Sequence, residues 1–146
     1  MYACYRTNAC RALLVGYAGG CTLSVSTSDA SFADTDNANI STQFFINGLW
    51  EEPLMFYKGE LDKKSTTNVT YFLDYFPSQM RLIMEENSNR WGIWRITLHC
   101  FRSCLMVVLE DPNGEDGTPF DEEAVSLYWM GSDGSGVLDH TYPIGE

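Results

Sequence analysis

The stretch Gln79-Met-Arg-Leu-Ile-Met-Glu-Glu-Asn-Ser-Asn-Arg-Trp-Gly-Ile-Trp-Arg-Ile-Thr-Leu98 decides how this chain folds. Apolar side chains recur at every second position in its first and last parts, at Met80, Leu82, Met84, Trp94, Ile96 and Leu98. A period of two is typical of β-strands, because successive side chains point to opposite faces. The stretch therefore predicts two strands joined as a hairpin by a polar loop. In the second strand, Ile93 is expected to share a face with Arg95, opposite Ile96.

Similar strand patterns extend outward in both directions. In addition to the two strands of the opening stretch, they predict strands at residues 21–29, 39–45, 54–57, 69–76, 105–109 and 124–130. No stretch of ten or more residues shows the 3.6-residue period of a helix. Many short strands separated by turns indicate an all-β protein built as an antiparallel β-sandwich. We expect an N-terminal arm at 1–20, a sandwich domain at 21–130 and a C-terminal tail at 131–146, with both extensions ordered.

The chain is strongly acidic. Its 146 residues include 9 Lys and Arg and 20 Asp and Glu, for a formal net charge of −11. Nucleic acid is therefore not expected as a partner, because phosphate binding requires clusters of basic side chains. The charge suits a cation, a basic protein surface or simple solubility. No apolar run approaches the ~18 residues of a membrane-spanning helix, so the chain is not expected to be an integral membrane protein.

Five cysteines favour an oxidising compartment. They are Cys4, Cys10, Cys21, Cys100 and Cys104, and their spacing does not match a zinc site. Two disulfides and one free thiol fit a secreted or organelle-lumenal protein. Two glycosylation sequons, Asn39-Ile-Ser41 and Asn68-Val-Thr70, agree with that location. The first twenty residues resemble the remnant of a targeting segment, but we expect them to form an ordered arm.

Residues 33–40 carry a family resemblance. Thr35, Asp36, Ala38, Asn39 and Ile40 match a T-D-A-N-V-like sequence, with Asn37 inserted. Together with the preceding strand, this looks like the opening of the PLAT domain, the β-sandwich module shared by polycystins, lipoxygenases and bacterial alpha-toxins. Residues 67–72, 80–85 and 91–98 are similar to later family strands in order and spacing. The resemblance covers about residues 21–110, and Ala33-Asp34 and Glu85-Glu86 depart from it, where the family has glycine and aspartate.

The resemblance implies a binding module rather than an enzyme, and in some members calcium is held in the end loops. Calcium prefers six to eight oxygen ligands from flexible loops. The side chains that could converge at one end of the sandwich as a calcium site are Asp34, Asp36, Asn37, Glu85, Glu86 and Asn87. The alternative is that these are ordinary solvated loop residues. Calcium is the only cofactor that the sequence suggests.

Large apolar side chains near the loops predict a partner surface. We assign this role to Leu49, Trp50 and Trp91, because aromatic residues at loop tips often insert into a partner. Trp50 could instead pack over the edge of the sandwich, and Trp91 could fill the core. Other protein subunits are the favoured partners. A membrane surface is the alternative, although an acidic domain matches anionic lipid poorly unless calcium bridges the two.

Catalytic motifs are missing from the sequence. Only two histidines are present, His99 and His140, and no G-x-S-x-G motif accompanies them. The sequence therefore predicts a non-enzymatic protein-interaction module, an accessory or structural subunit of a larger extracellular or lumenal assembly. The alternatives are a calcium-dependent lipid- or carbohydrate-binding domain and a hydrolase with an unrecognised site.

Overall fold

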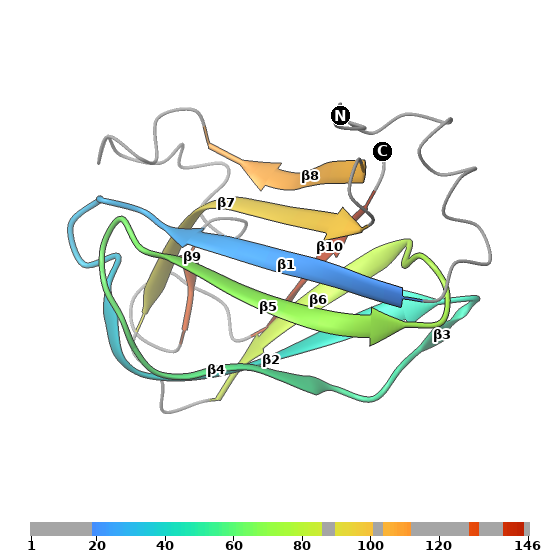
Figure 1. Cartoon of the computed structure of the whole chain (residues 1–146). Helices are drawn as coiled ribbons and strands as arrows, with labels where there is room; N and C mark the ends of the chain where they lie inside the picture. Colours follow the sequence, from blue (N-terminus) through green and yellow to red (C-terminus); the bar gives the residue numbers. More distant parts are fainter. Residues whose placement is uncertain (1–18, 86–89, 101–103, 112–128, 132–138, 145–146) are drawn as a thin grey trace.

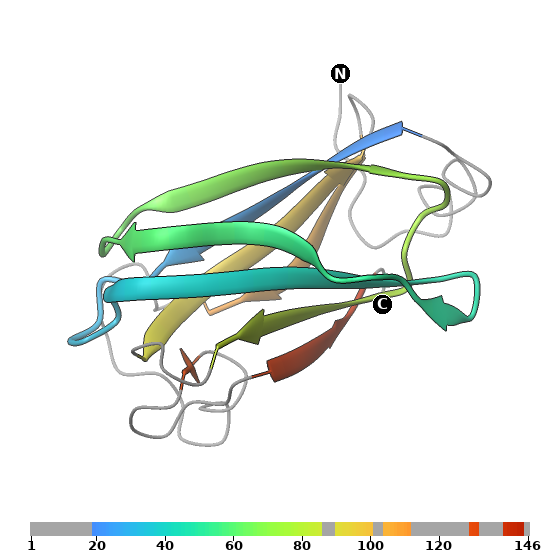
Figure 2. The same cartoon turned by 90° about the horizontal axis from the view of Figure 1, so that it is seen from below.

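The computed structural model describes residues 19–85, 90–100, 104–111, 129–131 and 139–144. These residues form two antiparallel sheets that pack face to face (Figure 1), and the view turned by 90° shows the same two layers (Figure 2). The predicted all-β antiparallel sandwich is therefore confirmed. Within the described ranges, no helix is long and apolar enough to span a membrane.

Each sheet has five strands. In the first sheet the order is β5 (Thr66–Leu73), β1 (Gly19–Thr27), β7 (Trp91–Cys100) and β8 (Cys104–Glu110), and β9 (Trp129–Met130) also pairs with β7. In the second sheet the order is β10 (Asp139–Pro143), β6 (Gln79–Met84), β2 (Thr35–Ile46) and β3 (Leu49–Trp50), and β4 (Leu54–Leu61) also pairs with β2. Strands β4 and β5 are consecutive in the chain but belong to different sheets, so they lie along one edge of the sandwich in both views.

The core lies between the two sheets and is built from the inward-facing side chains of the long strands. Leu23 on β1 and Leu98 on β7 face Ile40 on β2 and Leu82 on β6, and all four are fully buried. Burying a side chain of this size contributes about 1.5–3 kcal/mol. The alternation of apolar and polar residues in the sequence thus corresponds to the alternation of core and surface.

The predicted hairpin at the opening stretch is wrong. β6 and β7 are strands, as expected, but β6 pairs with β2 and β10 in the second sheet, whereas β7 pairs with β1 and β8 in the first. Each strand buries one face against the same core from opposite sides. A period of two reports which face is buried but not which neighbour pairs, so it is compatible with either arrangement.

Ile93 also lies on the face opposite to the predicted one. Ser26 pairs with Arg95 and Thr27 pairs with Ile93, so Trp94 is an extra residue on β7. An extra residue forms a β-bulge, which shifts the alternation by one position. Ile93 is therefore fully buried with Ile96, instead of lying on the face of Arg95.

The C-terminal stretch contributes a strand to the sandwich. β10 lies in the region expected to be a tail, and it pairs with β6 along residues 139–143. Its Tyr142 side chain is buried in the core, and that burial raises the pKa of the phenol above its ordinary value. Of the expected arm at 1–20 only Gly19 and Gly20 are described, and they open β1. Residues 124–128 of the last predicted strand lie outside the described residues.

A disulfide joins the two central strands of the first sheet. Cys21 on β1 and Cys100 on β7 are directly opposite in register, and their sulfur atoms are bonded within the buried core. This is one of the disulfides that the cysteine count suggested. Cys4, Cys10 and the side chain of Cys104 lie outside the described part of the chain.

The Cys21–Cys100 bond closes a loop with a sequence separation of 79 residues. Constraining so long a loop in the unfolded chain stabilises the fold, so replacing both residues by alanine is expected to lower the free energy of unfolding by about 2–4 kcal/mol. Equilibrium urea unfolding without reductant measures this change. As a control, dithiothreitol should lower the free energy of unfolding of the natural chain and leave that of the variant unchanged. Equal stability of the two proteins would contradict the prediction.

Gly92 allows the β1–β2 loop to approach β7 closely. Its N–H donates to the Ala33 carbonyl and its carbonyl accepts from the Ser28 N–H, both at 3.0 Å. A Cβ atom at this position would lie 2.9 Å from the Ala33 Cβ and 3.0 Å from an atom of the Trp129 ring. A side chain here would therefore push the loop away from the strand.

Gly92→Ala is accordingly expected to lower the free energy of unfolding by about 1–3 kcal/mol through overpacking. Gly20→Ala is the matched control, because its Cβ would meet only a Thr70 methyl at 3.4 Å and the Phe72 ring at 3.6 Å. That control should stay within about 1 kcal/mol of the natural chain. Thermal and urea denaturation of both variants measure the difference, and similar stabilities would argue against a close approach at Gly92.

Candidate functional site

The loops of the sandwich gather at two ends (Figure 1). We call one the acidic end. It comprises residues 28–37, which join β1 to β2 and include the start of β2, residues 60–65, which include the end of β4 and lead to β5, and Glu85 after β6. We call the other the groove end. It comprises residues 46–55 around β3 and residues 72–78, which include the end of β5 and the segment that follows it. The predicted metal ligands belong to the acidic end, and Leu49 and Trp50 belong to the groove end.

Four carboxylates interact at the acidic end. Thr35 pairs with Leu61, which sets the start of β2 beside the end of β4. The negative charge of Asp62 and its hydrogen bond with Glu60, followed by the charges of Asp36 and Asp34, raise the pKa of the Glu60 carboxyl above its ordinary value. The folded chain therefore binds the Glu60 proton more tightly than the unfolded chain does. The contribution of Glu60 to the free energy of unfolding falls as the pH rises through the raised pKa of its carboxyl.

The predicted calcium ligands are only partly brought together. Asp34 and Asp36 associate with Glu60 and Asp62, which the sequence analysis did not select. Glu85 lies at the same end, where its N–H donates to the Asn39 carbonyl at 3.2 Å. Glu86 and Asn87 lie outside the described residues. Among the residues with a described position, no group of three or more His, Cys, Asp and Glu side chains is arranged to hold a metal ion.

Trp91 is not a surface residue. Its side chain is 0% exposed, and its Nε1 donates a hydrogen bond to the Thr27 Oγ1 at 2.9 Å. The assignment of Trp91 to the partner surface is therefore corrected. A core position suits it because Thr27 satisfies the indole N–H while the ring fills the space between the sheets.

Trp50 packs against the outer face of the second sheet. Its ring lies edge-on to Phe45 with centroids 5.1 Å apart, and the Arg81 guanidinium lies 4.2 Å from its ring centre. Arg81 is held there by hydrogen bonds to Gln43 and Thr141. This is the alternative arrangement considered for Trp50, in which the ring covers the sandwich instead of projecting from it.

Leu49 projects from the turn between β2 and β3. Asn47 and Gly48 form this turn with positive φ angles of 54° and 84°, as expected for an Asn-Gly hairpin. The Leu49 side chain is 72% exposed. The structure thus places Leu49 where a partner can reach it, and the binding itself stays a prediction.

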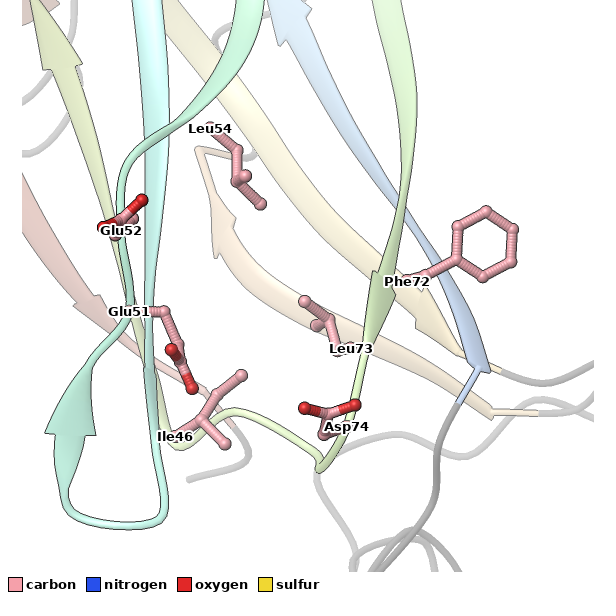
Figure 3. A pocket seen from close by; sticks show the side chains of 7 residues that line it. All are labelled: Ile46, Glu51, Glu52, Leu54, Phe72, Leu73 and Asp74. Carbon is pink, nitrogen blue, oxygen red and sulfur yellow. The ribbon is translucent and has the colours of Figure 1, made fainter.

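A groove lies beside this turn, between β5 and the segment that joins β3 to β4. It has a volume of about 450 Å³ and is lined by Ile46, Glu51, Glu52, Leu54, Phe72, Leu73 and Asp74. Ile46 and Leu73 are buried and form an apolar floor. Figure 3 shows Leu73 and Asp74 on one side, Glu51 and Ile46 on the other, and the Phe72 ring pointing away. The groove is thus apolar at its base and acidic at its rim.

Backbone hydrogen bonds fix the shape of the groove. The Glu51 N–H donates to the Phe44 carbonyl at 2.9 Å, and the Gln43 side chain donates to the Glu51 carbonyl at the same distance. The Tyr71 hydroxyl donates to the Met55 carbonyl at 2.9 Å from the opposite sheet. The segment joining β3 to β4 is therefore held in place before any partner arrives.

Most exposed apolar side chains belong to the groove end. In the described ranges the large exposed apolar residues are Leu49, Leu54, Met55, Phe72 and Tyr75 at this end, and Phe32 at the acidic end. Only Leu49 of this set was predicted from the sequence. In β5, Phe72 lies between the buried Tyr71 and Leu73, so strand alternation was the available signal for its exposure. Leu54 and Met55 are both exposed at the start of β4, so alternation does not predict them.

Searches with the sequence alone find no relatives: no protein-family model and no curated protein matches the chain. The fold, however, is similar to parts of solved structures. An engineered lipoxygenase, Delta413-417:GS LOX, shares a TM-score of 0.60 at 13% identity, over 88% of this chain and 16% of that one. Coral 8R-lipoxygenase, described as having calcium activation via a C2-like domain, gives 0.59 at 15% identity, over 87% and 17%.

Alpha toxin from Clostridium absonum gives a TM-score of 0.50 at 17% identity, over 86% of this chain and 32% of the toxin. The chain thus spans less than a fifth of these lipoxygenases and about a third of the toxin. Identities this low show the fold alone. The two stacked sheets, together with these matches, give the chain the PLAT-like, C2-like β-sandwich fold that its sequence resembles.

Proposed function

We propose that this domain is a non-enzymatic docking module that binds a basic, partly apolar segment of a protein partner in the groove between β5 and residues 51–54. The observation that carries the proposal is the groove itself, with a floor of Ile46 and Leu73 and a rim of Glu51, Glu52 and Asp74. A sandwich that presents such a groove can serve as an accessory subunit of an extracellular or lumenal assembly.

Charge supports a basic partner. Three of the seven residues that line the groove are acidic and none is basic. The whole chain carries a formal net charge of −11, so its long-range field attracts cationic segments and repels acidic ones. Complementary charge at an interface raises the association rate and selects the partner more than it raises the affinity.

Exposed apolar side chains supply the remaining interaction. Leu54 lies in the groove, and Leu49 and Met55 lie beside it on β3 and β4. Clustered apolar side chains with a polar rim are typical of interaction sites. An extended segment that alternates basic and apolar residues would place its apolar side chains on the floor and its cations against the rim.

The test measures binding of a synthetic peptide that alternates lysine and leucine to the full chain, by fluorescence anisotropy. Replacing Glu51 and Glu52 by Gln and Asp74 by Asn is expected to weaken binding about tenfold, because each rim ion pair contributes roughly 0.5 kcal/mol. The matched control neutralises Asp36, Glu60 and Asp62 at the opposite end, with the same change in net charge. Equal losses of affinity in both variants would show that net charge alone attracts the peptide and would refute binding in the groove.

Calcium-dependent attachment to a lipid surface is the second candidate. Two observations favour it: the negative charges of Asp62, Asp36 and Asp34 that raise the pKa of Glu60, and the similarity to a lipoxygenase described as calcium-activated through a C2-like domain. A divalent cation would offset these negative charges. It would also join an acidic domain to anionic lipid.

Calorimetric titration of the intact chain with calcium chloride tests this candidate. Uptake of calcium should disappear in the Asp36→Asn, Glu60→Gln double variant, which removes two of the repelling charges. It should persist in the Glu51→Gln, Asp74→Asn variant, which removes two charges at the groove end. If the natural chain takes up no calcium, this candidate fails while the groove proposal stands.

A further inference from the structure

The outer face of the first sheet lacks charge where β5, β1 and β7 lie side by side. Its middle consists of two cross-strand rows set by the strand register, Thr70–Thr22–His99 and Asn68–Ser24–Thr97. No Asp, Glu, Lys or Arg side chain occurs in either row. The next row contains Arg95, which lies 3.8 Å from Glu110. An uncharged hydroxyl and amide face is unexpected on so acidic a chain.

The sequon Asn68-Val69-Thr70 lies on this face. β5 is the edge strand of its sheet, and both Asn68 and Thr70 are exposed while Tyr71 next to them is buried. The Ser24 hydroxyl donates to the Asn68 Oδ1, and the Thr70 and Thr22 hydroxyls are 2.9 Å apart. The Asn68 side-chain oxygen therefore accepts a hydrogen bond from β1.

We propose that Asn68 carries an N-linked oligosaccharide, which lies over this uncharged face. In the reaction, the Asn68 amide nitrogen attacks the anomeric carbon of a lipid-diphosphate-linked oligosaccharide supplied by the secretory pathway. The new N–C bond forms as the bond from that carbon to the diphosphate oxygen breaks. The amide nitrogen loses one proton to a base, and the lipid diphosphate leaves. The reaction needs no oxidant or reductant.

The exposed ring of Phe72 provides an apolar surface on which the oligosaccharide can pack. Residues 68, 70 and 72 share one face of β5, because side chains alternate along a strand. Phe72 is 83% exposed, which is the highest value among the large apolar residues of the described chain. Its partner across the sheet is Gly20, which has no side chain to cover the ring. The apolar face of a sugar ring that extends from Asn68 over Thr70 can pack on this ring.

The second sequon is less suitable. Asn39 is only partly exposed and lies on β2, a central strand flanked by β4 and β6. The buried Cys21–Cys100 disulfide agrees with the oxidising compartment in which glycosylation occurs. This inference does not depend on the proposed docking function.

Peptide mapping of the protein from its own cells tests the site. Release of the glycan by an amidase in heavy-oxygen water is expected to convert Asn68, and not Asn39, into labelled aspartate. In a eukaryotic secretory host, Thr70→Ala should abolish the modification and Thr70→Ser should keep it. Recovery of Asn68 as unmodified asparagine, or labelling confined to Asn39, would overturn the proposal.

A second measurement tests the contact with Phe72. Glycosylated protein is expected to melt about 2–4 °C above enzymatically deglycosylated protein, which corresponds to roughly one good aromatic contact. This difference should largely disappear in Phe72→Ala and persist in Leu49→Ala, which changes an exposed apolar residue elsewhere. A difference that is unaffected by Phe72→Ala would refute the contact, while the peptide map decides the site.

Discussion

The burial of one face of each long strand against a shared core is the constraint on which the rest of this structure depends. Leu23 and Leu98 from one sheet meet Ile40 and Leu82 from the other, and all are fully buried. Once these positions point inward, the residues between them must point outward. The Cys21–Cys100 disulfide links β1 to β7, the two central strands of the first sheet. The core packing and the disulfide therefore favour the same pairing register of these strands.

Within the described residues, this constraint leaves surfaces that differ in chemistry. The acidic end holds carboxylates close enough to raise the pKa of Glu60. The groove end holds exposed apolar side chains beside Glu51, Glu52 and Asp74. The outer face of the first sheet holds neutral hydroxyl and amide groups in cross-strand pairs. The proposed partner, cation and saccharide would therefore each bind a different part of the domain.

Much of the fold could be predicted because strand periodicity is local. The alternation of Met80, Leu82 and Met84 in β6 predicted one apolar face, and all three side chains are buried. The cluster of carboxylates at the acidic end was predicted less well, because its members come from loops that are distant in the sequence. Glu60 and Asp62 joined Asp34 and Asp36 only through the pairing of β2 with β4, which no local pattern reveals. Residue type alone could not decide whether Trp91 lies in the core or on the surface, since a large aromatic ring suits a core and a partner surface equally.

The sequence by itself determined that this chain is an acidic, all-β sandwich, because composition and a two-residue period are properties of the chain read in order. Only the tertiary structure decided which strands pair, and therefore that β6 and β7 belong to different sheets. The bulge at Trp94, the burial of Trp91 and the groove beside Leu54 were likewise decided there. The physical reason is that these features depend on contacts between residues far apart in the chain, whose geometry is set only when both sheets close on the core.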